Sequence, residues 1–434
     1  MKLPSLRDER SALFLPLAIL ALGFVERVGL LAWRGVSHAQ GEAANVALSV
    51  ARDGTIADVF ARGSGLTAHL NPLLPLFAGS IYRLFGTQST VSEWILALVS
   101  ISVVLGAGAI FYHAAGLAGM ARTPRLVALA LFALLPVTPE LETTAFRVWE
   151  GGLAALLGAI VLSLCIRSER DCDLSHRRML ILGVTAGLLF FTNPALGLAA
   201  YAVIGLLLLR AVAPRKWLAH VAILAVTLFA VLTPWTIRNY EVFHRILPLR
   251  GNFGLELAIG NHPAALGTSD RQTFVDRLRT IHPLESQAAF DRMQAMGGEI
   301  PYANALGDEA KAWIRTHPGD FARLSVKHLV QYYFPPRWQW NIYSERVGKD
   351  VIFRQALLWA VAALGLLGAF AALFAWRERI LYLATFALVP ALPYIITQPV
   401  PRYRYIVLLP LLFLAANTAY RLYRKMVPGT AAAA

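Results

Sequence analysis

The stretch 94–114 reads WILALVSISVVLGAGAIFYHA and contains no Asp, Glu, Lys or Arg. A helix of this length reaches about 30 Å, which is the thickness of the hydrocarbon core of a bilayer. Similar apolar runs recur along the chain, separated by short polar connections. A bilayer admits only helices or closed barrels, and the runs lack strand-like alternation, so they predict membrane-spanning helices. The ten predicted spans are 11–33, 94–114, 125–139, 150–166, 179–193, 195–213, 217–237, 351–375, 379–397 and 404–422.

The overall composition supports the same class of protein. The chain has 434 residues, of which 57% are hydrophobic and only 15% are charged, and its mean hydropathy is +0.55. A soluble globule with so few charged side chains could not cover its apolar surface, so lipid must replace water as the main solvent. We therefore predict an all-α polytopic membrane protein.

The net charge of +14 would suggest nucleic acid as a partner in a soluble protein. Here many basic residues lie in short connections beside apolar runs, and we interpret them as topology signals, with no nucleic-acid partner. If the N-terminus is cytoplasmic, the cytoplasmic side receives Arg122, Arg125, the run 167–178, Arg215, Lys216, Arg377, Arg379, Arg421, Arg424 and Lys425. The only two cysteines, Cys165 and Cys172, offer neither a disulfide framework nor a metal cluster.

Two N-terminal features could change this topology. Residues 1–25 have the layout of a signal peptide, but apolar sequence resumes after Arg27 and continues to Trp33, so we expect an uncleaved first helix. The segment 72–85 is apolar but only about fourteen residues long and is interrupted by Arg83. We expect an interfacial or re-entrant helix there, because a span would invert every later basic loop.

The chain then divides into three parts. Residues 1–237 form an N-terminal transmembrane module whose first outer loop is 34–93, and residues 351–434 form a C-terminal transmembrane module. Between them, 238–350 is the longest stretch without an apolar span. Its amphipathic patterns at 272–296 and 303–332, interrupted by Gly297, Gly298 and Pro301, predict a small helical outer subdomain.

Several blocks carry a family resemblance. In the first outer loop these are GSGLTAHLNPLLPLF at 63–77 and IYRLFG at 81–86. PWTIRNY at 234–240, FGLEL at 253–257 and GNHP at 260–263 begin the outer segment, and PRYRY at 401–405 precedes the last span. Together they resemble bacterial membrane glycosyltransferases of the GT-C superfamily, most of all the family 39 branch that includes protein O-mannosyltransferases and aminoarabinose transferases.

The resemblance implies a GT-C-like bundle in the bacterial inner membrane with its active site on the outer face. Such enzymes transfer a sugar from a polyprenyl-phosphate donor to an acceptor, which the resemblance does not identify. It also implies that an acidic residue of the first outer loop is the catalytic base, and Glu42 stands at that place. Many relatives carry Asp there, whereas this chain has only the Glu. From spacing alone, Glu42 could equally be a carboxylate at a helix N-terminus, stabilised by the helix dipole.

A polyprenyl phosphate that leaves during sugar transfer needs fixed cations near the membrane surface. Arg402, Arg404 and Arg238 are candidates because they lie on the predicted outer side, against the positive-inside trend, and a guanidinium matches phosphate oxygens. The alternative is snorkelling of these side chains at helix ends.

Other residues of the outer segments are weaker candidates for substrate contacts. They are Asn71, Tyr403, Asn261, His262, Lys327, Glu140 and Glu142, with Glu150 beside the last two. No HExxH or CxxC spacing occurs, so we expect no tightly held metal and no certain cofactor, although a weakly bound divalent cation at Glu42 stays open. The rival interpretation of the whole chain is a transporter or lipid flippase. It predicts charges at mid-membrane and inverted repeats, and the sequence has little of either.

Overall fold

The computed structural model describes residues 6–136, 139–267, 269–340 and 349–427. Within these ranges the regular structure is helical, and the only strand-like feature is an isolated bridge between Ala57 and Leu66. The prediction of an all-α chain is confirmed for the residues described.

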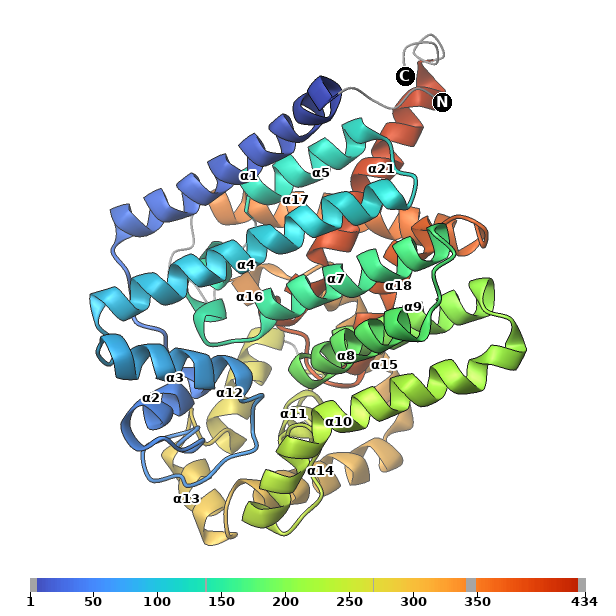
Figure 1. Cartoon of the computed structure of the whole chain (residues 1–434). Coiled ribbons are helices and arrows are strands. Elements are labelled where there is room, and N and C mark those ends of the chain that lie inside the picture. Colours follow the sequence, from blue (N-terminus) through green and yellow to red (C-terminus); the bar gives the residue numbers. More distant parts are fainter. Residues whose placement is uncertain (1–5, 137–138, 268, 341–348, 428–434) are drawn as a thin grey trace.

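The long helices run side by side as a bundle (Figure 1). Each predicted span overlaps a helix or a group of short helices, and residues 137 and 138 of the span 125–139 lie outside the described residues. These elements are α1 (Leu6–Arg34), α4 (Thr90–Leu117), α5 (Arg122–Leu134), α7 (Gly151–Arg170), α8 (His176–Thr192), α9 (Pro194–Ala211), α10 (Trp217–Phe243), α17 (Lys349–Leu373), α18 (Ile380–Leu388), η3 (Val389–Ala391), α19 (Leu392–Ile396), α20 (Pro401–Arg404), η4 (Tyr405–Val407) and α21 (Leu408–Met426).

Seven helices in the described part of the chain are long and apolar enough to cross a membrane. The count is eight if the two helical segments Arg122–Leu134 and Pro139–Arg147, which meet at a bend, together form one span. Two other predicted spans are shorter: α8 has 17 residues, and Pro390 and Pro393 lie in the interrupted segment α18–η3–α19. Proline lacks the amide hydrogen that a continuous helix needs. The structure thus supports a polytopic chain of about seven or eight spans, and the count of ten stays a prediction.

Small residues let the helices approach closely. A Cβ on Gly183 would lie 2.4 Å from Oγ1 of Thr227, where α8 meets α10, and a Cβ on Gly365 would lie 2.7 Å from the carbonyl oxygen of Leu411, where α17 meets α21. Backbones that come this near gain dispersion contacts, which matter most where lipid removes the hydrophobic drive for helix association.

The first outer loop packs across one end of the bundle. There α2 (Glu42–Asp53) lies against α3 (Leu73–Phe85) (Figure 1), so closely that a Cβ on Gly79 would approach within 2.6 Å of Val50. The 13 residues of α3 extend only about 20 Å, too short to cross a bilayer. Its length agrees with the expected interfacial helix.

Six helices from the described part of the segment 238–350 lie at the same end (Figure 1). They are α11 (Phe253–Gly260), α12 (Asp270–Ile281), α13 (Gln287–Ala295), α14 (Glu299–Thr316), α15 (Pro318–Tyr333) and α16 (Arg337–Trp340). The predicted break at Gly297 and Gly298 is present, and both residues have positive φ. Pro301 was expected to interrupt a helix and instead lies in the first turn of α14, where a missing amide hydrogen costs nothing.

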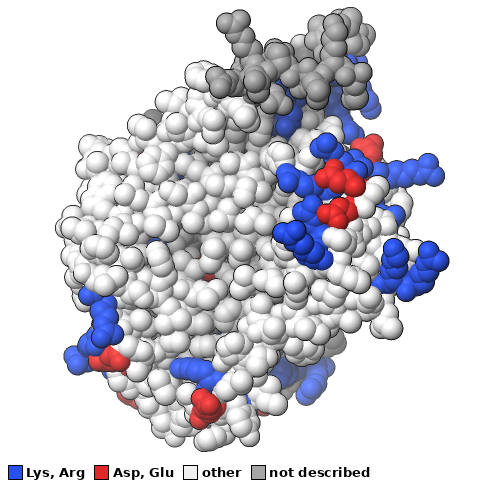
Figure 2. Space-filling model, viewed as in Figure 1, with Lys and Arg blue, Asp and Glu red and all other residues white. Residues whose placement is uncertain are grey.

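Charged side chains are unevenly distributed on the surface. Figure 2 shows Lys and Arg gathered at the end of the bundle where the α4–α5 and α7–α8 connections lie, with a broad, almost uncharged surface below them. The remaining charges in this view lie toward the end that carries α2 and α3. An uncharged belt between two charged ends is the surface expected of a protein that crosses a bilayer.

Candidate active site

A cavity of about 860 Å³ opens between the first outer loop, the outer subdomain and the segment before α21. It unites residues that are far apart in the chain, because Glu42 and Arg402 both line it. The other polar or aromatic side chains on its wall include Ser37, His38, Gln40, Asn45, Glu140, Trp149, Glu256, Phe274, His282, Glu285, Gln398 and Tyr403.

Glu42 is the first residue of α2 and is only 6% exposed. Gly41 before it has φ 88°, a left-handed conformation that suits glycine and lets the chain turn sharply into the helix. A carboxylate in the first turn is stabilised by the helix dipole. The sequence alternative, a helix-end carboxylate, is therefore true of Glu42 and does not exclude a place in the cavity.

Two histidines from distant segments hold this carboxylate. Nε2 of His69 lies 3.0 Å from Oε1 of Glu42, and Nε2 of His282 lies 3.3 Å from the same oxygen. The backbone amide of Leu284 donates to Nδ1 of His282 at 3.2 Å. A neutral His282 therefore carries its hydrogen on Nε2, facing Glu42. Because both imidazoles face Oε1, Oε2 is the oxygen left for a ligand.

The electrostatics of this group favour an ionised glutamate. Burial raises the pKa of Glu42, but the charges and hydrogen bonds of His69 and His282 outweigh it and hold that pKa well below 4.5. Burial lowers the pKa of His69, yet Glu42 and, more weakly, Glu299 and Glu256 bring it above 6.5. At neutral pH the carboxylate is thus charged and ready to accept a hydrogen bond.

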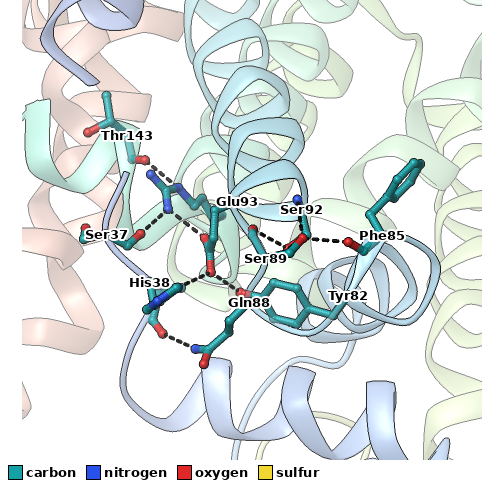
Figure 3. Close-up of polar contacts among 11 residues, drawn as sticks. Ser37, His38, Tyr82, Phe85, Gln88, Ser89, Ser92, Glu93 and Thr143 are labelled. Carbon is teal, nitrogen blue, oxygen red and sulfur yellow. Dashed lines mark hydrogen bonds and ion pairs between the residues drawn. The ribbon is translucent and has the colours of Figure 1, made fainter. Parts of the chain in front are cut away.

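A second buried carboxylate fixes the segment that leads to Glu42 (Figure 3). Arg147 donates to Oε2 of Glu93 at 2.7 Å and to the carbonyl oxygen of Ser37 at 2.6 Å. Tyr82 donates to Oε1 of Glu93 at 2.9 Å, and His38 lies 3.7 Å from it. Both oxygens of Glu93 are therefore occupied, and the pair anchors the cavity wall at Ser37.

The glutamates between the third and fourth predicted spans have different surroundings. Glu140 lines the cavity and pairs with Arg34 at 3.2 Å and Arg354 at 3.3 Å. Glu142 is fully buried and does not line the cavity: Arg27 donates to its Oε2 at 2.6 Å and Tyr405 to its Oε1 at 2.8 Å. Glu150 pairs with Arg250. Of the three glutamates, only Glu140 is brought to the cavity.

Of the three candidate arginines, only Arg402 lines the cavity. Its guanidinium lies 4.2 Å from the ring centroid of Trp149 and has a donor 3.1 Å from the hydroxyl of Tyr403. Arg404 is buried and donates to Gln339. Arg238 donates to the carbonyl oxygens of Thr67 at 2.7 Å and Ile56 at 3.1 Å, which ties the first loop to α10.

Tyr403 stands on the same wall as Arg402. Its hydroxyl lies 3.3 Å from Oε1 of Glu256, and its ring stacks on Tyr394 with centroids 4.8 Å apart. The guanidinium of Arg402 lies 5.0 Å from the centroid of the Tyr403 ring, which is a cation–π contact. The structure thus brings Tyr403, like Arg402, to the cavity.

Four other candidates do not line the cavity. Asn71 donates to the carbonyl oxygen of Phe191 at 2.7 Å, and Asn261 donates to that of Ile396 at 2.8 Å, so both connect backbone segments. His262 and Lys327 lie together in a small separate hollow, where Lys327 pairs with Asp270. Burial, with Arg277 nearby, lowers the pKa of His262 to about 4.

Sequence reasoning missed His69, His282 and Glu256 as cavity or carboxylate contacts. His69 lies within the resemblance block 63–77, and Glu256 within the block 253–257. His282 has no such signal, because it only ends an amphipathic helix. In the described ranges, no group of three or more His, Cys, Asp or Glu side chains could hold a metal ion. The weakly bound cation stays a prediction.

Neither the models of known protein families nor the curated proteins give a match to this chain. Among solved structures, one similar chain is the archaeal oligosaccharyltransferase AglB from Archaeoglobus fulgidus, in complex with an inhibitory peptide and a dolichol-phosphate. Its TM-score is 0.50 at 17% identity, over 98% of this chain and 52% of that one. The apo oligosaccharyltransferase of that organism gives 0.51 at 16% identity, over 95% and 51%.

A third similar structure is ArnT from Cupriavidus metallidurans bound to undecaprenyl phosphate, with a TM-score of 0.35 at 15% identity, over 93% of this chain and 77% of that one. At that score it carries no weight here. The chain spans about half the length of the oligosaccharyltransferases that it matches, and identities this low speak for the fold alone. On those two matches, the chain has a fold similar to that of the matched part of the archaeal oligosaccharyltransferase.

Proposed function

We propose that the chain is a membrane glycosyltransferase that moves a sugar from a polyprenyl-phosphate donor to an acceptor hydroxyl or phosphate, with inversion at the anomeric carbon. The observation that carries this proposal is that one cavity is lined both by a buried carboxylate, Glu42, and by a cation that can bind phosphate, Arg402. Sugar transfer needs both groups at once, and the transporter alternative needs neither.

For a hydroxyl acceptor, Glu42 is the general base. The acceptor oxygen attacks the anomeric carbon while its proton passes to Oε2 of Glu42, and the bond between that carbon and the phosphate oxygen breaks. His69 and His282 keep Oε1 fixed and the carboxylate ionised. They also make Glu42 a weaker base, so proton transfer accompanies bond formation rather than preceding it.

Arg402 is the group that receives the leaving phosphate. Its guanidinium offers several N–H donors, and packing against Trp149 holds its plane in place. The archaeal oligosaccharyltransferase of similar fold was captured with a dolichol-phosphate, which supports a polyprenyl-phosphate donor for this chain as well. Arg404 and Arg238, which have buried or half-buried hydrogen bonds to protein, support the walls around this site.

The orientation belongs to the same proposal: ten spans in a bacterial inner membrane, the basic end in the cytoplasm and the cavity outside. The basic connections gather at one end of the bundle (Figure 2), opposite the end that carries α2 and α3. A reporter inserted at Ser175 should therefore be cytoplasmic, and one at Asp270 should be external. An external report at Ser175 would contradict the orientation.

Mass spectrometry of envelope glycans and glycolipids from a deletion strain tests the function. Loss of one sugar from one acceptor should be reversed by the wild-type chain and not by a Glu42→Gln chain that is equally abundant in the membrane. An unchanged envelope in the deletion strain, or full rescue by Glu42→Gln, would reject the proposal.

A further inference from the structure

A second hollow of about 250 Å³ adjoins the cavity on the side of α12. Phe274, Leu278 and Glu285 line both spaces, so they form the shared wall. Arg271, Arg279 and Trp338 line the second hollow but not the cavity. We call this second hollow the α12 groove.

One face of α12 connects the α12 groove to the reacting carboxylate. Arg271, Phe274 and Leu278 are spaced three and four residues apart, which places them on the same side of a helix. His282, four residues after Leu278, caps the helix and reaches Glu42. At a helical rise of about 1.5 Å per residue, Arg271 lies roughly 16 Å along the axis from His282, and Arg279 roughly 5 Å.

The two arginines of the groove are available to an anion. Both are exposed, and neither has an ion pair or hydrogen bond with any residue that the structure describes. Arg277 of the same helix, by contrast, donates to the carbonyl oxygen of Ala258 at 3.0 Å. The one carboxylate of the groove, Glu285, lies at its boundary with the cavity and likewise has no ion pair in the described ranges.

The rest of the groove is apolar, with one unmet donor. Phe274, Val275 and Leu278 are half-buried, and the ring of Phe274 lies 5.6 Å from that of Trp338. Nε1 of Trp338 is buried and has no hydrogen-bond partner among the described residues. The groove thus combines two exposed cations with an apolar and aromatic lining.

We propose that the α12 groove binds the sugar acceptor, and that this acceptor is an amphiphile with an anionic group. The inference rests on the proposed function. Arg271 and Arg279 hold the anion, the apolar side chains hold a hydrocarbon part, and the reacting hydroxyl extends past Leu278 to Glu42. The two arginines that hold the anion lie roughly 5 and 16 Å from His282 along the axis of α12. Arg402, which lines only the cavity, keeps the donor phosphate.

Calorimetric titration of the full chain in neutral detergent tests the groove without any transfer reaction. The probes are dioctanoyl phosphatidic acid and dioctanoylglycerol, which share their hydrocarbon chains and differ in the anion. We expect the phosphatidic acid to bind at least about tenfold tighter, and Arg271→Gln/Arg279→Gln to remove that difference, because each arginine makes charge-assisted hydrogen bonds.

Matched variants separate the groove from a net-charge effect and from the donor site. Arg62→Gln/Arg315→Gln removes two exposed arginines elsewhere, neither with an ion pair in the described part, and should change the affinity by no more than about twofold. An equal loss in this pair would show a net-charge effect and overturn the proposal. Loss of binding in Arg402→Gln alone would place the probe at the donor site and overturn it too. If a hexaglutamate peptide binds as tightly as the phosphatidic acid, the groove does not need a hydrocarbon part in its ligand, and the proposal of an amphiphilic acceptor is rejected.

The groove and the proposed function can fail separately. Glu42→Gln should lower the transfer rate about 100-fold to 10,000-fold and leave phosphatidic acid binding intact. If transfer survives Glu42→Gln while Arg271→Gln/Arg279→Gln still loses binding, the function is wrong and the groove remains a binding site. If Glu42→Gln loses transfer but the arginine pair binds like wild type, the groove is wrong and the function stands.

Discussion

Glu42 and Glu142 are both buried glutamates of the loops that surround the cavity, but their oxygens are occupied differently. Arg27 and Tyr405 occupy the two oxygens of Glu142, whereas two histidines face a single oxygen of Glu42. Glu142 is shut inside the bundle, while Glu42 lines the cavity.

The partners explain what each carboxylate can do. An arginine does not release its proton at any pH that a protein tolerates, so the Glu142 pair is a permanent structural link. Histidine titrates near neutral pH, and one oxygen of Glu42 stays available to a ligand. Burial is thus common to both glutamates, and the difference lies in how many of their oxygens have partners in the protein.

The largest effect should come from Glu42→Gln, which keeps the size of the side chain but cannot accept a proton at neutral pH. We expect the transfer rate to fall about 100-fold to 10,000-fold, as is typical when a general base is removed, with donor affinity and thermal stability nearly unchanged. Purified protein and a radiolabelled polyprenyl-phosphate sugar would measure it. Glu309→Gln, at an exposed position of α14 that does not line the cavity, is the control and should lose little.

Glu142→Gln should show the opposite pattern. It leaves the guanidinium of Arg27, which is 0% exposed, without its charge partner. Breaking a buried ion pair from one side costs about 3–5 kcal/mol, so thermal unfolding in detergent should occur at a clearly lower temperature. The protein that remains folded should transfer sugar at nearly the normal rate. A large rate defect without destabilisation would place Glu142, contrary to its geometry, in the reaction.

Arg402 and Arg404 allow the same comparison between a cationic side chain that lines the cavity and one that is buried in the protein. Arg402→Lys keeps the charge at the cavity but loses the planar fork, so KM for the donor should rise about tenfold with little change in stability. Arg404→Lys should instead lower stability by about 1–3 kcal/mol, because Gln339 loses a buried partner. Donor titrations and thermal unfolding on both variants decide between them. If both variants change KM and thermal stability in the same way, Arg402 and Arg404 do not have different roles.

The sequence predicted the helices well and the side-chain partners poorly. Hydropathy located every helix of the described part that is long and apolar enough to cross a membrane, because solvation by lipid acts on each segment by itself. It could not count the spans, since Pro390 and Pro393 interrupt a run that is apolar throughout. The family resemblance singled out Glu42, but the sequence did not show the partners of Glu42 and Glu142. These partners are His69, His282 and Arg27, which reach the glutamates only through tertiary packing.

The smallest predicted effect is a pH dependence that separates the two carboxylates. Burial opposes the charged form of His69, but Glu42 outweighs it and holds the pKa of His69 above 6.5. The stabilisation from His69 is thus fully present below pH 6.5 and is lost as pH rises through its higher folded value. The pKa of Glu42 lies well below 4.5, so its contribution is present above 4.5 and is lost only in stronger acid.

The histidine-linked part of the stability should therefore decline from pH 6.5 upward, and this decline depends on Glu42. In Glu42→Gln the charge that raises the pKa of His69 is gone, burial dominates, and the alkaline decline should disappear. In Glu142→Gln the decline should persist, because Arg27 does not titrate in this range. Thermal unfolding of the wild type and both variants at pH 5.5, 7.0 and 8.5 measures the three slopes. If the stability of Glu42→Gln still declines above pH 6.5, the contact between His69 and Glu42 is not the cause of the decline.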